Sequence, residues 1–144
     1  MREVPRALDA ARETLALGHF VVAIQQAQIC VEYCARAVIH SYGEPAWGHS
    51  DAEDLEKALL HHGSDLRRRF GRETLRALQQ FAADDREMAP WHSRTVYGMR
   101  YQDGTFHPPS EMCTQAIAER ALLLAERSLT AAQGFLDAWH AAAP

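Results

Sequence analysis

The stretch FVVAIQQAQICVEYCARAVI, residues 20–39, decides the fold. Its apolar side chains recur at every third or fourth position, as in Phe20, Ile24, Ala27, Val31 and Val38. This spacing places them on one face of an α-helix. Gly43 and Pro45 follow the pattern and end it, because glycine and proline interrupt helices. The sequence therefore predicts a long central helix over residues 19–42.

Helices with the same spacing are expected on both sides of this central helix. An N-terminal helix should end at Gly18, and residues 50–63 and 64–83 should form two more helices, the second bent at Gly71. A final long helix should begin at Ser110 and run to the C-terminus. No segment alternates between apolar and polar residues as a half-buried strand does. The expected fold class is all-α, an antiparallel up-and-down bundle of about five helices in a single domain, residues 1–144.

The composition is typical of a globular domain. Of 144 residues, 47% are hydrophobic and 24% are charged. No apolar run approaches the roughly 20 residues that cross a bilayer, and the first residues are charged, so a cytoplasmic protein is expected. The formal net charge of −4 argues against a general coat protein of nucleic acid. A local basic cluster could still hold a phosphate backbone.

Cysteine and histidine raise the question of a metal site. Cys30 and Cys34 lie one helical turn apart and, with Cys113 or a histidine, could begin a zinc site. On an apolar helix face such cysteines are more typical of a core, and the sequence has no Glu-x-x-His pair of a di-metal carboxylate bundle. We therefore expect reduced thiols, no metal and no cofactor. His61 and His62 are expected at the end of a helix, beside the negative end of its dipole.

An arginine tract, RRRFGRETLR, occupies residues 67–76. A helix through this tract would place Arg69, Arg72 and Arg76 on one face. That face could bind phosphate groups, or it could be a solvated surface whose arginines pair with acids such as Glu73. The residues alone leave both interpretations open.

The helical pattern is absent from residues 84–109, which we therefore expect to form a long loop. Loops of this length often carry function. Arg94 and Arg100 are predicted to bind phosphate, because guanidinium groups match phosphate oxygens bidentately. Tyr101 is predicted to stack on a base or ribose, and Asp103 to orient an arginine.

The same segment holds candidates for cleavage of RNA without a metal ion. Arg100 could stabilise the phosphate in the transition state while His107 moves a proton. His107 is preferred because it directly precedes Pro108, where the final helix can hold it. Arg86 and His92 are the reserve pair.

Three groups of residues then follow one another in a fixed order. The central helix carries Ala27, Gln28 and Glu32. The start of the next helix carries His49, Asp51 and Leu55. The segment before the last helix carries Arg100, Tyr101 and Asp103. In order and spacing these groups resemble the HEPN domain family, in which an Ala-Gln and a Glu lie on a long second helix and an Arg-Tyr-Pro-Asp-like turn precedes the last. Gln102 stands where proline is usual.

The resemblance implies an up-and-down helical bundle that is commonly a dimer. It also implies a gene that often neighbours a small nucleotidyltransferase, in a two-component module of the toxin–antitoxin type. Some members are ribonuclease toxins with an Arg, a polar residue after it and a His a few positions later. Three pairs here have that spacing: Arg100 and His107, Arg86 and His92, and Arg12 and His19. Tyr101 and Glu87 depart from the residue that usually follows the Arg.

We therefore expect a nucleotide- or RNA-binding module that works with a nucleotidyltransferase partner. The alternative is a metal-independent ribonuclease toxin whose site forms at a dimer interface, and a purely structural bundle is the third possibility. A homodimer is expected because the central and final helices are apolar around more of their circumference than one bundle contact uses.

Overall fold

The computed structural model describes residues 3–43 and 51–142 of the chain. Most of these residues lie in helices, and one short β-hairpin interrupts them. In chain order the elements are α1 (Glu3–Ala16), α2 (Phe20–His40), α3 (Asp51–Met88), α4 (Trp91–Tyr97), β1 (Met99–Arg100), β2 (Phe106–His107), α5 (Pro109–Met112) and α6 (Gln115–Ala141).

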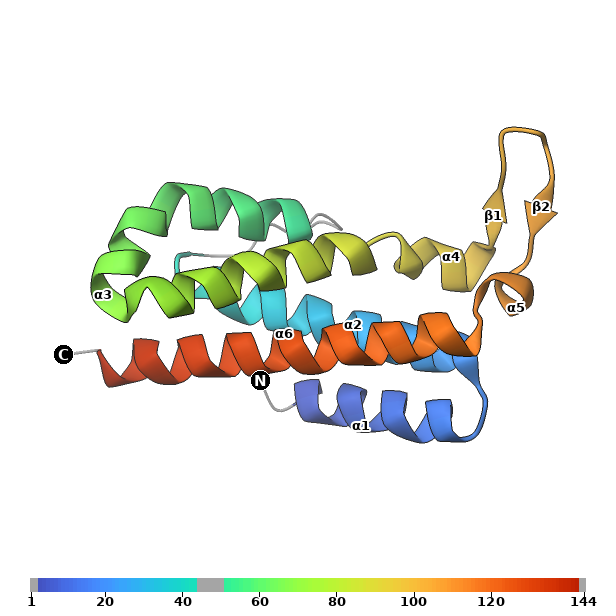
Figure 1. The fold of residues 1–144 in the computed structure, drawn as a ribbon, viewed down its shortest axis with the longest axis horizontal. Helices are drawn as coiled ribbons and strands as arrows, with labels where there is room; N and C mark the ends of the chain where they lie inside the picture. Colours follow the sequence, from blue (N-terminus) through green and yellow to red (C-terminus); the bar gives the residue numbers. More distant parts are fainter. Residues whose placement is uncertain (1–2, 44–50, 143–144) are drawn as a thin grey trace.

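Helix α2 lies at the centre of the bundle. It packs against α1, α3 and α6, and α6 also contacts α1 and α3. Figure 1 shows α1, α2, α6 and the second half of α3 running lengthwise beside one another. The predicted all-α bundle is therefore confirmed, and so is the prediction that the residues 20–39 form its central helix.

Buried side chains from α1, α2, α3 and α6 form one hydrophobic core. Among the fully buried side chains are Ile24, Val31 and Val38 of α2 and Leu124 and Phe135 of α6. Burial of one such side chain contributes about 1.5–3 kcal/mol relative to leaving it in water. The 3.6-residue periodicity that predicts α2 therefore also places its apolar face in the core.

Helix α3 is bent sharply into two arms at Gly71, where the backbone has φ 88° and ψ 169°. The bend that we expect there is confirmed, because only glycine adopts this conformation readily. The expected helix end at Gly63 is wrong, since α3 continues through it. A glycine inside a helix costs only about 1 kcal/mol relative to alanine, and buried Leu59 and Leu66 on either side hold the helix in place.

The two histidines before Gly63 therefore lie inside α3 and not at a helix end. Their expected interaction with a C-terminal helix dipole is wrong for this reason. The ring of His62 instead stacks on Tyr42, with centroids 4.3 Å apart, and His61 meets His62 edge to face. Stacking on a residue beyond the end of α2 gives His62 a packing role that local sequence does not indicate.

The expectation of a long loop over residues 84–109 is wrong. Helix α3 runs to Met88, and α4, β1 and β2 follow. Seven-residue helices and two-residue strands are too short to produce a periodic pattern. The final helix is also interrupted, because α5 ends at Met112 and α6 begins after Thr114, whose hydroxyl accepts a hydrogen bond from the Ile117 amide at 3.3 Å.

Candidate functional site

The β-hairpin projects from one end of the bundle, beyond α4 and α5 (Figure 1). Its two strands are antiparallel, with Met99 opposite His107 and Arg100 opposite Phe106. The hairpin begins at Gly98, where φ is 71° and an added Cβ would lie 2.4 Å from the His107 carbonyl oxygen. Glycine at this position therefore permits the close approach of the two chain segments.

The strand register decides which of the predicted site residues face each other. Residues opposite one another in an antiparallel pair point to the same face, and successive residues alternate. Arg100 therefore shares a face with Phe106, whereas His107 points to the opposite face. Tyr101 lies on the His107 side, and the two rings meet edge to face with centroids 4.8 Å apart. The structure thus brings Tyr101 and His107 together and separates Arg100 from His107.

A carboxylate on α5 contacts His107. The distance from His107 Nδ1 to Glu111 Oε2 is 3.4 Å, and the two residues are four positions apart in the sequence. When Nδ1 carries the hydrogen and faces the carboxylate, Nε2 is left to exchange a proton. Glu111 is not among the site residues that the sequence predicts. The four-residue spacing between His107 and Glu111 is the signal that could have revealed the pair.

Arg100 and Asp103 both contact the turn of the hairpin. Arg100 Nη1 donates to the Gly104 carbonyl at 2.8 Å. Asp103 accepts hydrogen bonds from the Thr105 hydroxyl and, at 2.9 Å, from the Thr105 amide. These bonds hold the pKa of Asp103 below its usual value. Asp103 therefore stabilises the turn, and among the described residues no hydrogen bond or ion pair joins it to an arginine.

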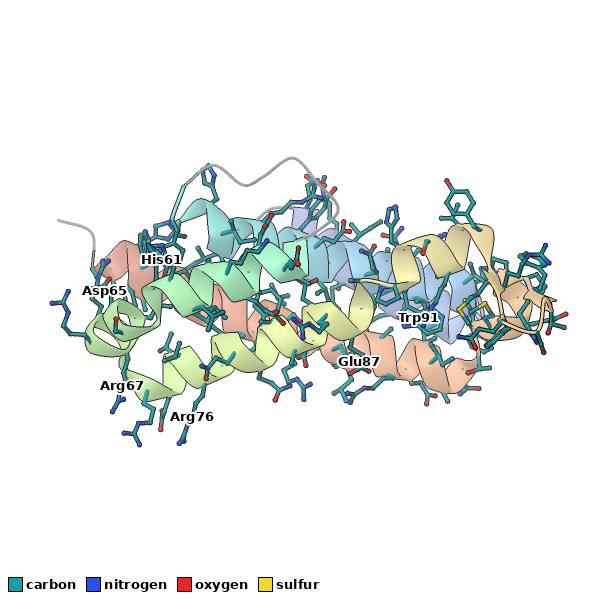
Figure 2. The ribbon with its side chains drawn as sticks, turned by 90° about the horizontal axis from the view of Figure 1, so that it is seen from above. His61, Asp65, Arg67, Arg76, Glu87 and Trp91 are labelled. Atoms are coloured by element: carbon teal, nitrogen blue, oxygen red, sulfur yellow. The ribbon has the colours of Figure 1, made fainter. Side chains whose placement is uncertain are left out.

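Arg94 lies on α4, over the indole ring of Trp91, which Figure 2 labels. Its guanidinium carbon is 5.2 Å from the ring centroid, within range of a cation–π interaction. Within the described residues, neither Arg94 nor Arg100 has a carboxylate partner. By contrast, one arginine of α3 and two of α6 each form an ion pair: Arg86 with Glu56, Arg120 with Glu87, and Arg127 with Asp84.

The two residues of the reserve pair, Arg86 and His92, line different cavities. Arg86 is engaged by Glu56 on the first arm of α3. His92 lines a cavity of about 270 Å³ between α2, α3 and α4. The polar residues that line this cavity are Gln28, Glu32, Asp85, His92 and Ser93.

This cavity contains two of the residues that carry the family resemblance. Gln28 is buried, and its amide donates to Glu32 Oε1 at 2.6 Å. The sequence pattern does not predict a cavity here. The available signal is the pair of polar residues, one turn apart, on the otherwise apolar face of residues 20–39.

The cysteines belong to the core. Cys30, Cys34 and Cys113 are buried free thiols. The hydrogen bond with Cys30, together with burial, raises the pKa of Cys34, so this sulfur stays protonated and is a poor metal ligand. Across residues 3–43 and 51–142, no group of three or more His, Cys, Asp or Glu side chains is placed to hold a metal ion.

The sequence model of the HEPN domain family matches residues 2–134. The chain belongs to the HEPN domain family. The match includes α2, the hairpin and most of α6. No curated protein and no solved structure matches the chain.

The structure describes the surroundings of two of the three groups of residues noted in the sequence. In this HEPN domain, Gln28 and Glu32 interact on α2, and Arg100, Tyr101 and Asp103 form part of the hairpin. His49 lies outside the described residues. HEPN domains are generally concerned with nucleotides or RNA, and they commonly dimerise. No helix in the described part of this HEPN protein is long and apolar enough to cross a membrane.

Proposed function

We propose that this HEPN protein is a nucleotide- or RNA-binding module and that its ligand contacts α4 and both faces of the hairpin, because Arg100 and Tyr101 lie on opposite faces. We call this region the hairpin surface, and it comprises Arg94, Arg100, Tyr101, Asp103 and His107. One observation carries the proposal. Two guanidinium groups without carboxylate partners among the described residues lie in the same end of the bundle as the Tyr101 ring, which is 47% exposed.

The chemistry of these side chains suits a phosphorylated, aromatic ligand. Arginine offers several coplanar N–H donors to phosphate oxygens, and Arg100 uses a hydrogen bond to Gly104 to hold its guanidinium in place. An exposed tyrosine ring contributes roughly 1–3 kcal/mol by stacking on a base. Asp103 acts indirectly in this proposal, because it holds the turn that carries Arg100 and Tyr101.

We further propose that the protein is a homodimer in the cytoplasm and works with a nucleotidyltransferase in a two-component system. The family resemblance supports the partner, and the buried free cysteines suit a reducing compartment. Val96, Tyr97 and Phe106 supply exposed apolar surface near the hairpin for a protein contact. Light scattering at micromolar concentration tests the dimer, and co-purification with a nucleotidyltransferase encoded beside this gene tests the partner.

A ribonuclease is the second candidate, and the contact between His107 and Glu111 favours it. A histidine oriented by a carboxylate can transfer a proton to or from RNA. Arg100 points to the other face of the same hairpin, so the two residues do not converge within one chain. A ribonuclease would therefore need Arg100 of one protomer beside His107 of a second copy, at the dimer interface.

Two measurements separate binding from cleavage. Fluorescence anisotropy with labelled single-stranded RNA and with a fluorescent ATP analogue measures binding, and gel electrophoresis of the RNA measures cleavage. Arg100→Ala and Tyr101→Ala should each weaken binding by about tenfold, which is the expected effect of losing one charged hydrogen bond or one stacked ring. Arg6→Ala is the control, because Arg6 is exposed but paired with Glu3 on α1.

The outcomes distinguish the two candidates. Loss of binding in the hairpin variants without any cleavage by the parent protein supports the binding module. Cleavage by the parent that disappears in both Arg100→Ala and His107→Ala supports the ribonuclease. If the parent binds neither probe, or if the hairpin variants behave like Arg6→Ala, the hairpin surface is not the site.

A further inference from the structure

The bend in α3 gathers arginines that the hairpin surface does not use. Arg68 and Arg69, just before the bend, both pair with Asp65. Across the described residues, Arg67, Arg72 and Arg76 have no carboxylate partner. We call these three residues the kink patch.

The kink patch differs from the helix face expected from sequence. A continuous helix would group Arg69 with Arg72 and Arg76. Arg69 instead packs its guanidinium over the rings of Phe70 and Trp139, at 4.9 and 4.8 Å from their centroids. The expected grouping is therefore wrong, because the bend at Gly71 changes the direction of the helix and α6 provides a ring for Arg69.

The three remaining arginines are exposed on the two arms of α3. Arg67 lies at the end of the first arm, and Arg72 and Arg76 lie one turn apart at the start of the second. In Figure 2 the labelled side chains of Arg67 and Arg76 both extend away from the bundle on the same side of the bend, whereas Asp65 lies on the other side. The bend therefore separates these guanidinium groups from Asp65, the carboxylate that pairs with Arg68 and Arg69.

Glu73 is the acid nearest to the kink patch in sequence. It lines a groove between α3 and α6 that also contains Thr74 and Arg127. No ion pair joins Glu73 to Arg72 or Arg76 in the described structure. The kink patch is thus a local concentration of uncompensated positive charge on a chain whose formal net charge is −4.

We propose that the kink patch is a second contact surface for RNA, which binds the phosphate backbone of a single strand. This inference rests on the proposed function for the identity of the ligand, whereas the location comes from the unpaired arginines. Guanidinium groups bind phosphate oxygens irrespective of base identity. The nearby rings of Phe70 and Trp139 pack on each other and on Arg69, so no stacking platform is left and the contact is independent of sequence.

The kink patch and the hairpin surface lie at opposite ends of the bundle (Figure 1). Because the two surfaces are separate, we expect the phosphate contacts of each one to add to the salt dependence of RNA binding. For a single strand, the slope of log affinity against log salt changes by about 0.7 for each phosphate contact. Loss of all three arginines should therefore reduce that slope by about 2.

The test uses the full chain and a labelled oligouridylate over a series of salt concentrations. The variant Arg67→Ala/Arg72→Ala/Arg76→Ala should show the smaller slope and weaker binding at low salt. Arg68→Ala is the matched control for the single variant Arg72→Ala, because each removes one positive charge from the same helix and Arg68 is already paired with Asp65. Its slope should equal that of the parent, while Arg72→Ala alone should lower the slope by about 0.7. Substitution of all three by lysine should preserve most of the slope.

Four results overturn the proposal. If the triple alanine variant keeps the parent slope while Arg100→Ala weakens binding, the kink patch does not contact RNA and the proposed function stands. If the parent binds the fluorescent ATP analogue but no RNA, the kink patch proposal fails and the proposed function stands as a nucleotide-binding module; if the parent binds neither probe, both proposals fail. If a polyglutamate peptide competes as well as RNA, and only when the three arginines are present, the surface binds an acidic protein instead.

Discussion

Arg127 on α6 holds the carboxylate of Asp84 on α3 through two hydrogen bonds, from Nε to Oδ2 at 2.7 Å and from Nη2 to Oδ1 at 2.5 Å. The Asp84 side chain is 2% exposed, and the Arg127 side chain is 41% exposed. Gln80 also donates to Asp84 at 3.0 Å. This ion pair joins the second arm of α3 to α6 and fixes the position of α3 beside the core.

The unequal burial of the two partners predicts unequal effects of their removal. Arg127→Ala leaves a buried carboxylate with only Gln80 as a donor, and it should lower the free energy of unfolding by about 2 kcal/mol. Asp84→Ala leaves Arg127 free to hydrate and should cost less than about 1 kcal/mol. Urea unfolding at neutral pH measures both. Equal losses, or a larger loss for Asp84→Ala, would contradict this account.

Two glycines in α3 should respond in opposite directions to the same substitution. Gly63 lies within a regular helical segment, and an added Cβ meets no atom within 4 Å, so Gly63→Ala should stabilise the protein by about 0.5–1 kcal/mol. Gly71 has φ 88°, so Gly71→Ala should destabilise it by about 1–3 kcal/mol. Thermal unfolding of both variants provides the comparison. If Gly71→Ala stabilised the protein, residue 71 would not have a positive φ in the native helix.

Alanine substitutions at two glycines of the hairpin distinguish the effect of backbone strain from that of steric overlap. Gly98 and Gly104 both have positive φ, 71° and 87°. An added Cβ at Gly98 would lie 2.4 Å from the His107 carbonyl oxygen, whereas an added Cβ at Gly104 would meet no atom within 4 Å. Gly98→Ala should therefore open the hairpin more than Gly104→Ala. Amide hydrogen exchange of Tyr101, which donates to the Thr105 carbonyl at 2.8 Å, reports the opening. Similar exchange rates in the two variants would argue against the close contact.

Tyr42 makes stability depend on alkaline pH. Its hydroxyl is buried with no hydrogen-bond partner in the described structure, and burial raises the pKa of Tyr42 to about 12 from a usual value of 10.0. A raised tyrosine pKa means that the unfolded chain loses its proton first, so stability is intact below pH 10 and declines as pH rises towards 12. At pH 11 the loss should be about 1 kcal/mol.

The variant Tyr42→Phe provides the control for that pH dependence. It removes the titrating group while keeping the ring that stacks on His62 and meets Trp139. Stability at neutral pH should be unchanged or higher, because a buried hydroxyl without a partner is removed. The difference in unfolding free energy between pH 9 and pH 11 should shrink by about 1 kcal/mol. An unchanged difference would show that Tyr42 ionises as readily in the folded protein as in the unfolded chain.

Much of the candidate site could be located from sequence, although its geometry could not. The chemistry of their side chains makes Arg94, Arg100, Tyr101 and His107 candidates, and the structure places all four on α4 and the hairpin at one end of the bundle. The strand register then decides which of these side chains share a face of the hairpin, because a shift of one residue in a strand moves every side chain to the other face. No local pattern in a two-residue strand reveals that register, and so the separation of Arg100 from His107 emerges only in three dimensions.

The sequence alone determined that the chain forms a helical bundle around residues 20–39, although it did not determine the extent of α3. Apolar periodicity over residues 20–39 is a local property, and so is the preference of glycine for the backbone conformation at Gly71. Tertiary structure alone decided which charges stay uncompensated. Arg69 packs on Trp139, and Arg127 pairs with Asp84, although these partners lie far apart in the chain. Such contacts depend on how helices pack, since the same arginine can meet solvent, a ring or a carboxylate without any change in local sequence.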